Sequence, residues 1–257
     1  MIKKFTIGLG LMAAALSLPS EAGIIRVQPV DFIAGSGLIT FSEFGLNTVN
    51  PTYAPASYGG GAGSPTVTFD GYFMGQTRPN NAALCPPGAN LGGCVTGTPT
   101  GSLALDPNAP DTRIVSDGAN PTSPVLSGGP STFNGSIAVL FSNDVSGVGL
   151  DGGYFNGIGG TAITAYARDG SILGSVTNTG LGIEFLGLVT DNGSEQIAGL
   201  LFSLVGSEPA GFAIDNLHFG RAGQVNVPGN RVPEPATLAL LGLGALGLGY
   251  GRRRKQK

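Results

Sequence analysis

Tryptophan is absent from this 257-residue chain, and histidine occurs once, at His218. Hydrolysis by a Ser-His-Asp or Cys-His set needs a histidine base, so His218 is the sole candidate for that chemistry. It alternates with Leu217 and Phe219 near the end of a strand-like segment, which favours an outward-facing structural histidine. A glycosidase with paired carboxylates is an alternative, but the acidic residues form no recognisable motif and the usual aromatic platform for sugars is missing. We therefore expect the protein not to be an enzyme.

Lysine is confined to the two ends of the chain, at positions 3, 4, 255 and 257. Residues 23–232 contain six Arg and 14 acidic residues, which gives this body a formal charge of −8, whereas the whole chain has −3. Affinity for a phosphate backbone comes largely from Lys and Arg, so no nucleic-acid partner is expected. The charge is compatible with neutral glycans, cations or basic proteins as partners.

Charged residues make up only 11% of the chain, which contains 45 Gly and 18 Pro. Long amphipathic helices need more helix-forming and charged residues than this, so short strands between Gly, Asn and Asp turns are expected. The predicted fold is all-β, with one antiparallel β-sandwich in residues 23–219 and a linker at 220–231. Strands are expected at 38–44, 67–73, 136–142, 145–155, 162–168, 171–177, 183–190, 196–205 and 211–219.

The dipeptide Asp169-Gly170 separates two of these strands and is a strong hairpin signal, because a type I′ turn needs positive φ at both central residues. From 75 to 130 the alternation of apolar residues nearly disappears, with 102–105 and 113–115 as short strand candidates. We expect a long insertion of low order there. It contains both cysteines, Cys85 and Cys94, which we expect to form a disulfide because a metal site would need further ligands.

The N-terminus has the pattern of an export signal. Lys3 and Lys4 precede an apolar run at 5–18, and Ala22 ends a short segment with small residues before the expected cut. The prediction is a helical signal peptide at 1–22, export by the Sec machinery and cleavage by signal peptidase between Ala22 and Gly23. A retained N-terminal anchor is the alternative.

The C-terminus has the pattern of a membrane segment. Residues 235–251 carry no charge and are followed by a basic cluster, Arg252, Arg253, Arg254 and Lys255. A helix there would reach roughly 25 Å at about 1.5 Å per residue, and snorkelling Arg side chains could make up the difference from the ~30 Å hydrocarbon core. Basic residues stay on the cytoplasmic side. A transmembrane helix is therefore predicted at 235–251, holding the precursor in the inner membrane with its body across it.

Ahead of this helix stands Val232-Pro233-Glu234-Pro235. The motif, the apolar run and the basic cluster, in that order at the end of the chain, resemble the PEP-CTERM sorting signal of Gram-negative bacteria. The resemblance covers residues 232–257. It implies cleavage near the motif by an exosortase, a membrane-embedded enzyme, and delivery to the cell surface or an extracellular matrix. A plain C-terminal membrane anchor is the alternative.

The body also resembles, more loosely, the bodies often found upstream of such tails. An early strand with Ile39-Thr-Phe-Ser and a last strand at 212–219 bracket a jelly-roll-like sandwich in them. Jelly rolls of this sort include carbohydrate-binding modules, so the resemblance implies a noncatalytic protein associated with exopolysaccharide or biofilm. A secreted hydrolase acting on that polysaccharide and a purely structural or partner-binding surface protein are the alternatives.

No cofactor is required by these patterns, but two sets of ligand residues are candidates. Asp144, Asp151 and Asp215 lie beside Gly-rich backbone and could supply oxygens to a structural Ca²⁺, although Asp also serves simply as a turn residue. Tyr53 and Tyr58, in a loop, could stack on sugars, with core packing as the alternative.

Overall fold

The computed structural model describes residues 23–118, 123–209 and 211–229. In these residues strands predominate, and the helical segments are three short 3₁₀ turns, η1 (Pro29–Asp31), η2 (Pro55–Tyr58) and η3 (Ala82–Leu84). The predicted all-β, antiparallel fold class is confirmed. Within the described part of the chain, no helix has the length and apolar character to cross a bilayer. The helices predicted at 1–22 and 235–251 lie outside that part.

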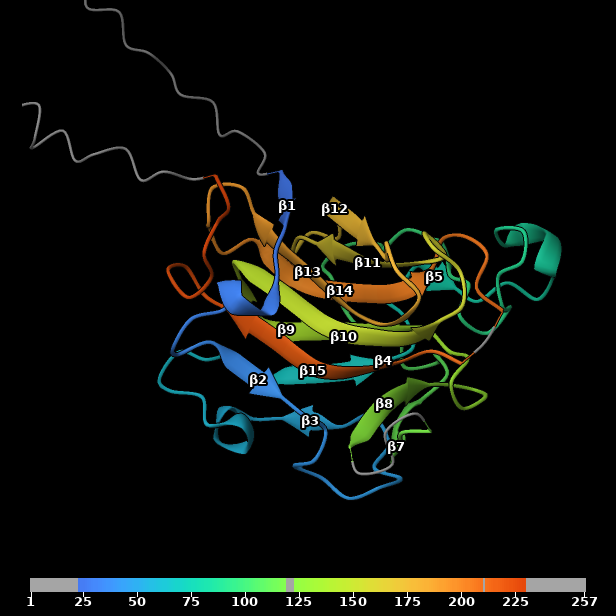
Figure 1. Ribbon diagram of the computed structural model, residues 1–257, viewed down its shortest axis with the longest axis horizontal. Helices are drawn as coiled ribbons and strands as arrows, with labels where there is room; N and C mark the ends of the chain where they lie inside the picture. The colour runs from blue at the N-terminus through green and yellow to red at the C-terminus, as the bar shows by residue number, and fades with distance from the viewer. Residues whose placement is uncertain (1–22, 119–122, 210, 230–257) are drawn as a thin grey trace, which may run out of the picture.

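Two antiparallel sheets make up most of the molecule (Figure 1). The larger has the order β1 (Ile24–Arg26), β13 (Gly182–Thr190), β10 (Gly147–Phe155), β15 (Ala213–Gly220), β8 (Pro124–Gly128) and β7 (Thr112–Ser116), and β2 (Gly37–Ile39) also pairs with β15. The smaller has the order β12 (Ile172–Thr177), β11 (Thr161–Tyr166), β14 (Ile197–Leu204), β9 (Ile137–Val145), β4 (Val67–Asp70) and β3 (Thr52–Tyr53). A small separate ladder joins β5 (Gln76–Thr77) to β6 (Thr96–Gly97).

The inner faces of the two sheets bury one shared core. Its members come from both sheets, and many are completely buried, among them Val139, Phe141, Leu150, Leu186 and Phe202. Alternate residues of β9 and β10 point into this core, so the period-2 pattern in the sequence does mark the buried face. Burying a side chain of this size contributes roughly 1.5–3 kcal/mol, so the sandwich is held together mainly by this apolar layer.

Glycines in β10 make room for aromatic rings on both faces of the larger sheet. A Cβ at Gly152 would stand 2.7 Å from the Phe155 ring and 3.0 Å from that of Phe202, both in the core. A Cβ at Gly149 would meet the Phe185 ring at 2.4 Å. The glycine content of this strand therefore reflects close packing by phenylalanine.

The hairpin predicted at Asp169-Gly170 is present between β11 and β12, but its turn differs from the expected type I′. Gly170 has a φ of 86°, whereas Asp169 is not among the positive-φ residues. The Ala167 N–H donates to the Ser171 carbonyl at 2.9 Å, and the Gly170 N–H donates to the Ala167 carbonyl at 3.0 Å. The connection is thus a three-residue loop that ends in a left-handed glycine, which needs positive φ at one position only.

The prediction of a low-order insertion at 75–130 is wrong for most of that segment. It supplies β5 and β6, and β7 and β8 join the larger sheet. Leu103 and Ile114 from this region are buried. Its irregular apolar pattern arises because β5 and β6 have two residues each and because β8 pairs with β15 at the single register position Ile214–Leu126.

The segment after β15, expected to be a linker at 220–231, packs against the sandwich as far as it is described, to residue 229. Val225 is buried beside Val27 and Val189, and it forms a β-bridge with Phe32. The Asn226 N–H donates to the Asp31 carbonyl at 2.8 Å. Gly23 and Val227 lie near the β13–β14 turn, where the Asp191 N–H donates to the Gly23 carbonyl. Both ends of the described chain therefore lie at one end of the sandwich (Figure 1).

Candidate functional site

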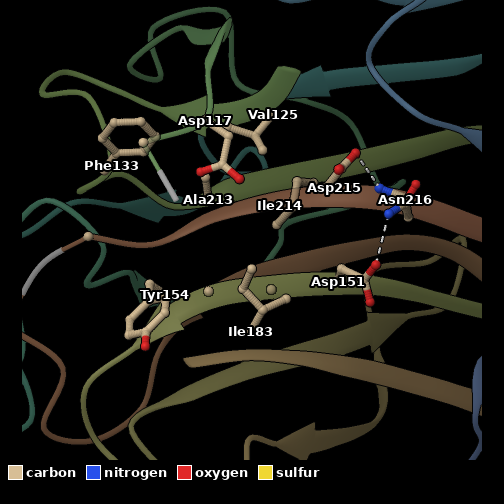
Figure 2. A pocket seen from close by; sticks show the side chains of 14 residues that line it. Asp117, Val125, Phe133, Asp151, Tyr154, Ile183, Ala213, Ile214, Asp215 and Asn216 are labelled. Atoms are coloured by element: carbon tan, nitrogen blue, oxygen red, sulfur yellow. Dashed lines mark hydrogen bonds between the residues drawn. The ribbon is translucent and has the colours of Figure 1, made fainter. Parts of the chain in front are cut away.

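A pocket of about 410 Å³ opens on the outer face of the larger sheet, where β10 ends and β15 begins (Figure 2). Strands β8, β10, β13 and β15 contribute to its walls. The pocket lies at the opposite end of β10 and β15 from the chain ends, because β10 begins at Gly147 beside Gly220. Its volume is within the range of sites that hold small molecules or single sugar units.

Asp151 and Asp215 face each other across the β10–β15 ladder, in which they are direct partners. Their side chains lie on the outer face because their neighbours Leu150 and Ile214 belong to the core. Asn216 contacts both: its Nδ2 donates to Asp151 Oδ2 at 2.9 Å, and its backbone N–H donates to Asp215 Oδ1 at 2.7 Å. A third carboxylate, that of Asp117, also lines the pocket.

A local irregularity of β15 places these groups. Asn216 has a φ of 46°, in the left-handed region, and the β10–β15 register shifts between Gly149 and Asp151. Asparagine tolerates this conformation better than most residues. Bulges of this kind redirect side chains and are common beside functional sites.

Burial raises the pKa of Asp215 above its ordinary value, and the charges of Asp151 and Asp117 raise it further. Hydrogen bonds from the Ser123 hydroxyl, at 2.8 Å, and from the Asn216 backbone act in the opposite direction. Three acidic groups therefore share one pocket closely enough for their charges to interact.

The other wall of the pocket is apolar. We call Tyr154 and Ile183 the apolar rim; they are 55% and 58% exposed. In Figure 2 Tyr154 and Ile183 lie across the pocket from Asp117 and Phe133. A ligand with one apolar face and several polar groups would match both walls.

The three carboxylates predicted as a Ca²⁺ site are not brought together. Asp144 lies on β9, in the other sheet, and pairs with Arg168 at 2.5 Å. Asp151 and Asp215 are neighbours on the larger sheet. Among the described residues no group of three His, Cys, Asp or Glu is arranged to hold a metal ion. No cofactor is indicated by the part of the chain that the structure describes.

The prediction that Tyr53 binds sugars is wrong, whereas for Tyr58 it stays a prediction. Tyr53 is 0% exposed and packs edge-on against Phe41 and Phe69 in the core. Tyr58 is half-buried, packs edge-on against Phe219, and donates a hydrogen bond to the Pro65 carbonyl. Their loop includes β3, the edge strand of the smaller sheet. The sequence does not predict this strand because it has only two residues.

His218 lies outside the pocket. Its ring is 5.3 Å from that of Phe32 and 5.7 Å from that of Phe185, centroid to centroid, on the outer face of the larger sheet. Burial lowers its pKa, and the charge of Asp151 acts against that. Its environment fits the structural role expected for it.

The predicted disulfide is confirmed: Cys85 and Cys94 are bonded, with Cα atoms 5.9 Å apart. The loop they close holds the β14–β15 connection. Asn90 donates from its backbone to the Glu208 carbonyl at 2.7 Å and from Nδ2 to the Pro209 carbonyl at 2.8 Å. Glu208 is buried, and its Oε2 accepts the backbone N–H groups of Asn156 and Gly157. The disulfide loop thus supports the end of the sandwich where the pocket lies.

The family model of the PEP-CTERM protein-sorting motif matches the chain at residues 231–255. This motif implies that the protein is exported and begins as a membrane-anchored precursor. More particularly, the chain carries the tail of an exosortase substrate, which confirms the resemblance at Val232-Pro233-Glu234-Pro235 and at the basic cluster. No curated protein matches the chain. The motif, the basic cluster and Ala22 lie outside the described residues.

Proposed function

We propose that the body is a noncatalytic glycan-binding module that an exosortase delivers to the cell surface or to the exopolysaccharide matrix of a biofilm. The observation that carries the proposal is the sorting motif at 231–255. Exosortase processing implies an export route that ends at the surface, where polysaccharide is the polymer a bound protein would meet. Signal peptidase, the Sec machinery and the inner membrane are the earlier partners on this route.

The strand order supports a jelly roll. Eight consecutive strands, β8 to β15, cross from one sheet to the other at every step except the β11–β12 hairpin, so that β8-β15-β10-β13 faces β9-β14-β11-β12. This is the arrangement of a double-sheet jelly roll, an architecture that includes lectin domains. Because a fold does not determine function, the support is for the architecture and not for a particular ligand.

The pocket supports the binding role. A pyranose ring has an apolar face that would lie on Tyr154 and hydroxyl groups that would donate to Asp151 and Asp215. The exposed positions of Tyr154 and Ile183 leave this contact surface available. The ligand proposed is therefore a sugar unit of a longer polymer.

A hydrolase is the second candidate, and one observation favours it. The raised pKa of Asp215 beside Asp151 is the kind of difference that separates a general acid from its partner carboxylate in glycosidases. We prefer the noncatalytic role because burial and the neighbouring charges account for the raised pKa without catalysis.

The test is to incubate the exported protein, purified from cells, with the polysaccharide of its host. Retention of the protein on the polymer with unchanged chain length is expected. Shortening of the polymer would establish the hydrolase instead, and neither retention nor shortening would leave a structural or partner-binding role.

A matched pair of substitutions tests whether the pocket is the binding surface. Ile183→Ala removes part of the apolar rim and should weaken retention severalfold. Ile172→Ala removes an equally exposed isoleucine, 57% against 58%, from the edge strand β12 of the other sheet, and should leave retention unchanged. Equal effects of the two substitutions would show that the binding surface is not at the pocket.

A further inference from the structure

We propose that the pocket selects sugars that carry a free ammonium group, that is, 2-amino-2-deoxy sugars in a deacetylated polymer. This inference rests on the proposed function and names the ligand class of the same site. It follows from three features of the pocket taken together: its charge, its size and the exposed apolar rim.

The charge of the pocket has one sign. Three carboxylates line it, and no Arg is among the described residues that do. Asp151 and Asp215 take part in none of the ion pairs between described side chains, which are Arg26–Glu184, Arg168–Asp144 and Arg221–Glu195. Their repulsion is felt at Asp215, whose pKa the other two raise. A bound cation would relieve this repulsion, whereas a uronate would add to it.

The size and shape of the pocket favour an organic cation over a metal ion. The carboxylates are not grouped to coordinate a metal, as noted above for the described residues. The space of about 410 Å³ is far larger than an ion needs and continues to the apolar rim. A sugar ring on Tyr154 would fill the apolar part, and an amine on that ring would reach toward the carboxylate wall.

The amine also suits the hydrogen bonding of that wall. An ammonium group has three donors and no acceptor, and ionised carboxylates only accept. Hydrogen bonds with one charged partner are roughly twice as strong as those between neutral groups, and an ammonium group on a carboxylate adds the attraction between opposite charges. Acetylation removes the charge and leaves one donor on the same nitrogen, so the acetylated sugar should bind more weakly at the same position.

Calorimetric titration of the exported protein with three tetrasaccharides tests this. The probes are glucosamine tetrasaccharide, its fully N-acetylated form and galacturonic acid tetrasaccharide. We expect the glucosamine form to bind about tenfold or more tightly than the acetylated form, with no binding of the galacturonic acid form. The affinity for the glucosamine form should fall as salt is raised, because the attraction is between charges.

Charge-removing variants test the assignment to the pocket. Asp151→Asn and Asp215→Asn should each bring the ratio of the affinities for the amine and acetylated forms closer to one. Asp191→Asn, in an exposed turn at the other end of the sandwich, should leave that ratio unchanged. Circular dichroism shows whether each variant is folded, and the salt dependence of the unaltered protein tests the proposal independently of any variant.

The outcomes distinguish this inference from the proposed function. Equal affinity for the amine and acetylated forms, or no affinity for either while the host polymer is still retained, would overturn the inference alone. Loss of retention on the host polymer as well would overturn both. Stoichiometric binding of Ca²⁺ by itself, with exclusion of the glucosamine form, would reassign the pocket to a metal ion and also overturn the inference.

Discussion

Replacing Asp70 by Asn should stabilise the protein at neutral pH. Asp70 ends β4 and is 8% exposed, with its Oδ1 accepting the Gly71 N–H at 2.8 Å. Burial raises its pKa to about 6 from 3.8, the Gly71 hydrogen bond opposes this, and the charges of Asp111 and Asp106 add to it. Asn keeps the acceptor oxygen but carries no charge, so it removes the cost of an ionised group at this place.

The sign and the size of the change in the free energy of unfolding follow from the linkage between protonation and folding. Because the folded-state pKa lies above the unfolded one, the contribution of Asp70 is fully present below about pH 4 and is lost as the pH rises through about 6. A shift of this size corresponds to about 3 kcal/mol, and we expect about 1 to 3 kcal/mol because water near the group reduces the effect. For a chain of this length that is a rise in Tm of about 3 to 9 °C.

Thermal unfolding of the exported protein and of Asp70→Asn, measured from pH 4 to pH 8, provides the assay. The two curves should coincide near pH 4, separate as the pH rises to about 6, and keep that separation up to pH 8. Asp169→Asn is the control, because hydrogen bonds from Ser171 lower the pKa of this exposed carboxylate, so its loss should not stabilise. A variant Asp70→Asn that is no more stable at pH 8 than at pH 4, relative to the unaltered protein, would refute the reasoning.

Three further predictions concern processing and packing. Glu234→Ala should leave export intact and block the C-terminal cut, so that mass spectrometry finds Lys257 retained; an unchanged cut would remove Glu234 from recognition. Replacing Cys85 and Cys94 by Ser should lower the free energy of unfolding by about 2.5 to 3 kcal/mol in denaturant titration, since the bond closes a loop with a sequence separation of nine; no loss would contradict the chain-entropy model. Gly135→Ala should cost at least about 2 kcal/mol, because its Cβ would stand 2.2 Å from the Gly129 carbonyl oxygen, whereas Gly45→Ala, with open space around it, should cost little.

Much of the second half of the fold could be predicted from the sequence. The strands β9 to β15 were expected within a few residues of their observed bounds, because each has an apolar run or alternation and is flanked by Gly, Asn or Asp. The early strand around Ile39 was expected to be longer than β2 is, and it ends because Phe41 takes a positive φ of 57°. That conformation is rare for a large residue and follows from burial of its ring in the core.

The candidate site could be predicted only in part. Asp151 and Asp215 were named as ligand candidates, but their pairing across β10 and β15 depends on a register between positions 64 residues apart that no local pattern specifies. Asp144 shares with them only its position beside Gly-rich backbone, and it lies in the other sheet. The sequence predicts Tyr53 in a loop and Tyr154 in a strand, and only the packing of the two sheets shows that the first is core and the second is rim.

The positions of the chain ends and the pocket have a mechanical consequence. Gly220, at the end of β15 nearest the tail, and Asp215, in the pocket, lie on the same strand. A pull between an anchored tail and a polymer held in the pocket would run along β15 and its neighbour β10. Hydrogen bonds in an antiparallel ladder are perpendicular to the strands, so the pull would load them together in shear instead of opening them one at a time. In the proposed role, this orientation would help the body to resist tension between an anchored tail and a bound polymer.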